Sequence, residues 1–206
     1  MNLKDTYDTI AVDWHKDHLS DDWWIDGMGK FTGMLPAGST VLDAGCAGGV
    51  KSKFLTDKGF QVTGIDFAPN FIKIAKEEVP EAEFRVLDIR DIASLEKQFD
   101  GIVLQAVLLH FSKKEIPDIL KNIIAKLKTN GILFISVKEP RENQPDEEMK
   151  VENDYGYKYE RFFSYFSQRE LEDILVRLNL DITFSDVHLN GKTRWLQIIA
   201  RKDESV

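Results

Sequence analysis

Apolar and polar positions follow two alternating rhythms through most of this 206-residue chain. Short apolar runs predict buried strands at about 40–44, 61–65, 83–87, 100–105 and 131–137. Stretches with helical spacing lie between them, at about 50–58, 69–78, 91–97 and 113–128. Strands that alternate with helices are typical of a doubly wound α/β fold, in which helices cover both faces of a parallel sheet.

Turn residues support several of these boundaries. Pro69 stands where the second helix should begin, and Asn130-Gly131 is expected to close the fourth helix before the fifth strand. The rhythm stops after Pro140, and about residues 140–165 show no clean period. A helix at about 167–179 follows, and two strands at about 181–188 and 194–202 are joined by Asn190-Gly191. That dipeptide between apolar runs predicts a β-hairpin.

The first 35 residues are rich in aromatic and charged side chains and predict one or two helices. We expect residues 1–35 to form a helical cap, with Tyr7 and Trp14 facing a ligand. Residues 36–206 would form one α/β domain that carries an insertion at about 140–165. A hydrophobic content of 43% is sufficient for a single core at this length.

The first strand runs into a glycine-rich turn, Val41-Leu42-Asp43-Ala44-Gly45-Cys46-Ala47-Gly48-Gly49. A helix is predicted to follow, so the turn would present backbone N–H groups to a polar ligand. A nicotinamide or flavin fingerprint needs glycine at the first, third and sixth positions of the turn, which here hold Gly45, Ala47 and Val50. The match to that fingerprint is poor.

These residues resemble the first motif of class I S-adenosylmethionine-dependent methyltransferases, where an acidic residue stands two places before the first glycine. The later strands continue the resemblance, because they end in Asp66, about 23 positions after Asp43, then in Asp88, then in Gln105. The chain departs from the family at Ala47, where glycine is usual. The resemblance covers about residues 38–202. It implies a Rossmann-like, seven-stranded, mainly parallel sheet with an antiparallel last strand.

The resemblance also implies how S-adenosylmethionine, or its product S-adenosylhomocysteine, is bound. Asp43 would lie beneath the turn and hold loop amides or, through water, the ammonium group of the ligand. Asp66 would accept the ribose hydroxyls, with Phe67 against the adenine. Asp88 would accept from the adenine amino group, and Gln105 would border the sulfonium. Further contacts are expected from Tyr7, Trp14, Gly45, Cys46, Ala47, Gly49 and the backbone N–H of Ile89.

The remaining candidate residues favour no metal and no cysteine chemistry. Cys46 is the only cysteine, which excludes an internal disulfide, and we interpret it as a small apolar residue rather than a nucleophile. His15 and His18 are three residues apart, but no third ligand follows at a defined spacing. We therefore predict a solvated helix face and no metal site.

His110 follows the fourth strand and resembles a histidine that many small-molecule methyltransferases carry there. It could deprotonate the acceptor, or it could only pack and hydrogen-bond near the cofactor. We favour the second role, because a sulfonium methyl group is already reactive and positioning can supply most of the rate. Acceptor contacts are expected from Lys138, Arg141, Tyr157 and Arg161, and a basic group at Lys138 or Arg141 would suit an anionic acceptor.

Charge and hydropathy limit the possible partners. A net charge of −8 and a pI near 5.1 disfavour a broad nucleic-acid footprint. Without a membrane-spanning run or a signal peptide, a cytoplasmic monomer or homodimer is expected. The sequence thus predicts methyl transfer to O, N or S of a small soluble molecule. Two alternatives stay open: a tRNA wobble-uridine methyltransferase, which the C-terminal region also resembles, and a non-catalytic subunit that binds S-adenosylmethionine.

Overall fold

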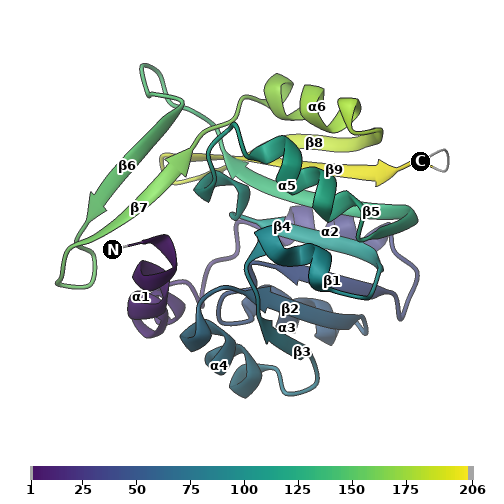
Figure 1. Cartoon of the computed structure of the whole chain (residues 1–206), viewed down its shortest axis with the longest axis horizontal. Coiled ribbons are helices and arrows are strands. Elements are labelled where there is room, and N and C mark those ends of the chain that lie inside the picture. The colour runs from purple at the N-terminus through teal and green to yellow at the C-terminus, as the bar shows by residue number, and fades with distance from the viewer. Residues whose placement is uncertain (1, 204–206) are drawn as a thin grey trace.

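The computed structural model describes residues 2–203, and its main feature is a seven-stranded sheet (Figure 1). The strands of this sheet are β1 (Thr40–Ala44), β2 (Gln61–Asp66), β3 (Glu83–Val86), β4 (Phe99–Gln105), β5 (Leu127–Lys138), β8 (Leu180–Asn190) and β9 (Thr193–Lys202). Their order is β3-β2-β1-β4-β5-β9-β8, and β9 runs antiparallel to both of its neighbours. This confirms the predicted fold, including the antiparallel last strand.

Helices cover both faces of the sheet. They are α2 (Ile25–Gly33), α3 (Val50–Asp57), α4 (Pro69–Glu78), α5 (Ile116–Ile124) and α6 (Gln168–Arg177), with a 3₁₀ helix η1 (Ile89–Ser94). In Figure 1, α5 lies in front of the sheet and α2 behind it. Leu120 of α5 belongs to one core with Leu104 and Leu133, whereas Met28 of α2 packs with Phe134 on the opposite face. The two cores explain why the central strands are apolar along their whole length.

Two predicted helices end differently in the structure. The helix expected at 113–128 is α5, which ends at Ile124, because Leu127 already pairs with Phe99 of β4. Asn130, at φ +62°, and Gly131 therefore lie inside β5 rather than at a helix end. The segment expected as a helix at 91–97 forms the shorter η1. In both places, strand pairing between distant segments takes precedence over local helical spacing.

The insertion contains a hairpin that the sequence did not predict. Strands β6 (Glu147–Glu152) and β7 (Tyr159–Ser164) pair antiparallel as a second sheet. Met149 and Val151 are exposed, whereas the alternate residues Glu148, Lys150 and Glu152 are partly buried. The hairpin thus turns charged side chains inward, which reverses the usual alternation of a half-buried strand and conceals its period.

The N-terminal region forms two helices with different surroundings. Helix α1 (Leu3–Asp17) begins at Asn2, whose side chain accepts a hydrogen bond from the Asp5 N–H, and it lies beside α4 and β7 (Figure 1). Helix α2 instead packs against the sheet, where Phe31 is fully buried. Only α1 is therefore placed as a cover for the ends of the strands.

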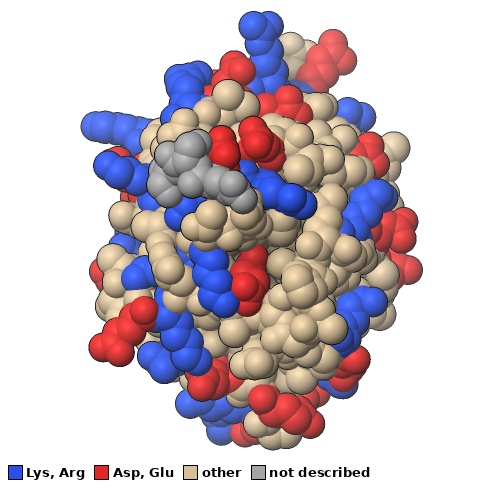
Figure 2. Space-filling view, turned by 90° about the vertical axis from the view of Figure 1, so that its right-hand side faces the viewer, with Lys and Arg blue, Asp and Glu red and all other residues tan. Residues whose placement is uncertain are grey.

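The surface carries charges of both signs. Figure 2 shows the side of the molecule that is on the right in Figure 1, and Lys and Arg side chains are interspersed there with Asp and Glu. Among residues 2–203, no helix combines the length and the apolar character that crossing a membrane requires.

Candidate functional site

A cavity of about 300 Å³ opens at the carboxyl ends of the central parallel strands. The chain leaves β1 toward β2 on one side, while β4 pairs with β1 on the other side, so the crevice lies at a topological switch point. Helix α1 and strand β7 border it. Its lining includes Tyr7, Trp14, His18, Asp21, Trp23, Asp43, Gly45, Cys46, Ala47, Gly48, Lys51, Asp66, Phe67, Gln105, Val107, His110, Lys138, Arg161, Phe163 and Trp195.

The glycine-rich turn forms one wall of this cavity. Gly45 has φ +82°, and a Cβ there would lie 2.3 Å from the Val107 side chain, so only glycine fits. Ala47, the departure from the family motif, adopts the left-handed region at φ +46° and donates its N–H to Asp66 at 3.0 Å. At Gly48, a Cβ would lie 2.2 Å from Nδ1 of His15. The turn is thus closed against α1 and the loop after β4.

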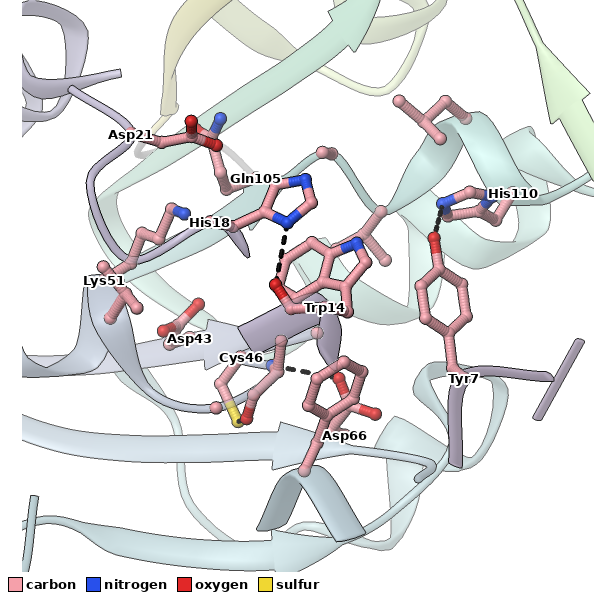
Figure 3. Close-up of a pocket in the computed structure, with 18 of the residues that line it drawn as sticks. Tyr7, Trp14, His18, Asp21, Asp43, Cys46, Lys51, Asp66, Gln105 and His110 are labelled. Atoms are coloured by element: carbon pink, nitrogen blue, oxygen red, sulfur yellow. Dashed lines mark hydrogen bonds between the residues drawn. The ribbon is translucent and has the colours of Figure 1, made fainter. Parts of the chain in front are cut away.

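Two buried carboxylates stand beside the turn (Figure 3). Asp43 is 1% exposed and accepts a hydrogen bond of 2.7 Å from the Ser52 hydroxyl. Asp66 accepts the backbone N–H groups of Ala47 and Ala68. Burial raises the pKa of each carboxyl to about 6, although these hydrogen bonds oppose the shift. The wall that faces a ligand is therefore rich in acceptors.

Several polar atoms in the cavity wall have no partner within the described chain. Neither Oε1 nor Nε2 of Gln105 makes a hydrogen bond, although the residue is buried, and Nε1 of Trp14 is also unpartnered. Buried amide and indole groups in folded proteins are nearly always hydrogen-bonded. Since Gln105 and Trp14 line the cavity, these groups are available to a molecule bound there.

The end of the cavity opposite Lys51 and Asp43 holds a chain of hydrogen bonds (Figure 3). Nδ1 of His110 donates to the Phe162 carbonyl at 2.8 Å, so the neutral ring presents Nε2 as an acceptor. The Tyr7 hydroxyl donates to that Nε2 at 2.7 Å and accepts from Nη1 of Arg161 at 3.2 Å. Glu152 in turn binds the Arg161 guanidinium, with 2.7 Å between Nη2 and Oε1.

This arrangement keeps His110 uncharged. Burial lowers the pKa of the imidazole to about 3, and the nearby Arg161 and Lys138 act in the same direction. The one lone pair that a neutral imidazole offers is already taken by the Tyr7 proton. The hydrogen bond to His110 thus fixes the orientation of Tyr7, and both residues line the cavity.

The structure brings most predicted site residues together, with some exceptions. The residues that do not line the cavity are Gly49, Asp88, Ile89, Arg141 and Tyr157. The Asp88 carboxylate binds the Arg90 guanidinium at 2.6 Å and accepts the Arg90 N–H, and its expected contact with the adenine stays a prediction. Tyr157 donates to Asp13 on α1.

Other residues of the cavity were missed by sequence reasoning. Lys51 follows the glycine turn by two positions, and Asp21 lies between α1 and α2; burial lowers the pKa of the Lys51 ammonium. Trp195 faces Lys138 across the β5–β9 pairing. An aromatic residue shortly after the Asn190-Gly191 turn was the only indication in the sequence, because the register of β9 is not visible there.

The predicted solvated histidine face of α1 is wrong. His15 is 7% exposed and packs against the glycine turn, and His18 stacks on Trp14 with 4.0 Å between ring centroids. The described residues 2–203 contain no group of three candidate metal ligands. Cys46 is buried, and burial raises the pKa of its thiol well above the usual value, which disfavours a thiolate.

Known proteins resemble the part of the chain that contains most of the cavity residues. A family described as methyltransferase domain matches residues 13–184. A ubiquinone biosynthesis O-methyltransferase of Xanthomonas axonopodis is 36% identical in an alignment 140 positions long, and the alignment covers 57% of this chain and 56% of the relative. The chain thus aligns with about half the length of the curated relatives it matches.

Solved structures extend the comparison of folds to nearly the whole chain. A Burkholderia thailandensis 1,6-didemethyltoxoflavin-N1-methyltransferase, crystallised with S-adenosylhomocysteine, has a TM-score of 0.76 at 20% identity and covers 98% of this chain and 87% of its own. A Synechocystis magnesium protoporphyrin IX methyltransferase with bound S-adenosylmethionine has a TM-score of 0.74 at 16% identity, covering 98% and 95%. Together, the matched family, the sheet order and the glycine turn establish that this chain belongs to the methyltransferase domain family, with the class I fold.

Proposed function

We propose that this protein transfers a methyl group from S-adenosylmethionine to O, N or S of a small molecule. The observation that carries the proposal is the pairing of a glycine turn with buried, unpartnered polar atoms in one cavity, at the carboxyl edge of the sheet. The relatives support it, because they are named as methyltransferases and two of the solved structures contain S-adenosylmethionine or its product.

The residues of the cavity fit the chemical groups of this cofactor. Asp66 has acceptor capacity for a ribose diol, Phe67 offers an aromatic face, and the Gln105 amide has no other partner. Lys51 can bind a carboxylate, while Asp21 and Asp43 can attract an ammonium group. When bound, S-adenosylmethionine supplies a methyl group that its sulfonium charge has made electrophilic.

The chain's own residues then have to position an acceptor and exclude water. Tyr7, held from both sides by His110 and Arg161, places a hydroxyl in the cavity wall. Trp14 of helix α1 and His18, which follows that helix, stack on each other and line the cavity. Fixed geometry of this kind accelerates an in-line displacement without a dedicated base. A small acceptor also agrees with the net charge of −8, which disfavours binding of tRNA.

Calorimetry tests the cofactor assignment directly. S-adenosylmethionine and S-adenosylhomocysteine should bind in the micromolar range, about −8 kcal/mol. Asp66→Ala should weaken both by roughly 1–3 kcal/mol, because the ribose hydroxyls lose their acceptor. Asp57→Ala is the matched control, since the exposed Asp57 pairs with Lys53 on α3 and does not line the cavity, and it should change affinity little. Tight binding of NADH with none of S-adenosylmethionine would refute the proposal.

A further inference from the structure

Three cations surround one aromatic ring at the edge of the cavity. Nζ of Lys138 lies 4.5 Å from the ring centroid of Phe163, Cζ of Arg161 lies 5.2 Å away, and Nζ of Lys150 lies 5.5 Å away. Three positive charges at this spacing repel one another, and the repulsion is strong where water is partly excluded. Each therefore requires an anion nearby.

Two of the three cations have such an anion. Arg161 is bound by Glu152, and Lys150 lies 3.3 Å from Oε1 of Glu148. Lys138 differs, because no Asp or Glu oxygen among the described residues lies within 4.0 Å of its Nζ. Within residues 2–203, Nζ of Lys138 instead lies over the aromatic faces of Phe163 and Trp195, the latter at 5.3 Å.

Lys138 also stands where a ligand can reach it. It is the last residue of β5, at the carboxyl edge of the sheet, and it lines the same cavity as Tyr7 and the glycine turn. Burial lowers the pKa of its ammonium to about 8, and Arg161, Lys150 and Arg141 contribute to the same shift. Glu152 opposes the shift from a distance, but it forms its ion pair with Arg161, so the Lys138 ammonium has no carboxylate partner of its own.

We infer that the methyl acceptor is a planar, anionic molecule, and that Lys138 binds its anionic group between the faces of Phe163 and Trp195. An aromatic carboxylate is the simplest molecule of this class. Trp195 is itself stacked on Trp23 at 4.1 Å, which gives the aromatic wall a fixed orientation. The inference rests on the proposed function, because it assigns to the acceptor the part of the cavity that the cofactor does not fill.

The inference can be tested before the natural acceptor is known. The probes are 2-naphthoate and 2-naphthamide, which share one planar ring system and differ in charge. Binding of each is measured by calorimetry or ligand-observed NMR at pH 7, with the protein saturated with S-adenosylhomocysteine. Naphthoate should bind at least about tenfold more tightly, since hydrogen bonds to charged groups are the stronger ones. Lys138→Met should abolish this preference, and Lys138→Arg should restore part of it.

A matched control comes from the same cluster. Lys150→Met removes a cation that Glu148 already compensates and that does not line the cavity, so the preference for naphthoate should persist. Equal affinity for the two probes in the wild type, no binding of either, or a preference that survives in Lys138→Met would overturn the inference. Affinity for S-adenosylhomocysteine, measured on the same samples, reports separately on the proposed function, because its absence would contradict that function without bearing on the choice of acceptor.

Discussion

The role of His110 can be decided by a substitution that keeps its hydrogen bond and removes its ability to act as a base. His110→Gln places an amide oxygen near the position of Nε2, where the Tyr7 hydroxyl donates, but glutamine takes up no proton in the accessible pH range. His110→Ala removes the imidazole ring and with it the hydrogen bonds to the Tyr7 hydroxyl and to the Phe162 carbonyl. If His110 only orients Tyr7, the first variant should retain most of the activity and the second should not.

The structure sets the size of both effects. Alanine would leave the Tyr7 hydroxyl and the Phe162 carbonyl without His110, at a cost of roughly 1–3 kcal/mol for each group left unpaired. In glutamine the acceptor remains, so we expect a rate within about tenfold of wild type. Loss of a general base would instead reduce the rate by about 10²–10⁴.

The pH dependence of the free energy of unfolding gives a second quantity that can be calculated for His110. The folded pKa of His110 is lowered by burial to about 3, below its unfolded value, so the unfolded state takes up a proton first as the pH falls. Wild type should therefore lose stability below about pH 6.5. Relative to His110→Gln, the loss between pH 7.5 and 4.5 is up to about 3 kcal/mol, at 1.36 kcal/mol per pH unit.

Three measurements check this reasoning. Urea unfolding at pH 7.5 and 4.5 compares the stability of wild type and His110→Gln. NMR of the histidine ring signals, assigned with His110→Ala, follows protonation; the His110 signal should stay constant over this range. Single-turnover reactions, once an acceptor is identified, compare the rates across pH. A His110 signal that titrates near pH 6.5, together with a more than hundredfold slower His110→Gln, would refute the positioning role.

Two further predictions follow from the same cavity. Asp43→Asn removes a buried charge whose carboxyl pKa burial raises to about 6, so it should stabilise the protein by up to about 3 kcal/mol at pH 8, with a smaller gain at pH 4.5, in urea unfolding. An equal gain at both pH values would contradict this. Helix α1 should exchange amide hydrogens more slowly when S-adenosylhomocysteine is bound, because Tyr7 and Trp14 line the cavity. Identical exchange with and without ligand would show that α1 is no lid.

The layout of the sheet could be predicted because it depends on short-range patterns. The apolar runs that became β1, β2 and β4, and the turn that begins at Gly45, carry their periodicity and turn chemistry within about ten residues. Parallel strands bring their carboxyl ends to one edge, so Asp43, Asp66 and Gln105 were expected to be neighbours, and they are. The β6–β7 hairpin escaped prediction because its charged side chains point inward.

The partners of the charged residues were decided only by the tertiary structure. At the end of β3 the sequence places an acid in the same pattern as Asp66, yet Asp88 is held by Arg90, two residues along the chain. Tyr7 forms hydrogen bonds with His110, 103 positions away in the sequence, and with Arg161, 154 positions away. Contacts at such separations follow from how α1 and β7 pack over the sheet, which no local pattern records.

The sequence alone therefore determined the α/β architecture and the edge of the sheet at which the cavity lies, since strand periodicity and glycine conformation are local properties. The tertiary structure decided which charges remain uncompensated in the cavity. Lys138 is one basic residue among several in the sequence, and it is distinguished only because Glu152 and Glu148 fold onto Arg161 and Lys150 instead. Charge compensation depends on distances between side chains from different elements, and those distances exist only in the folded chain.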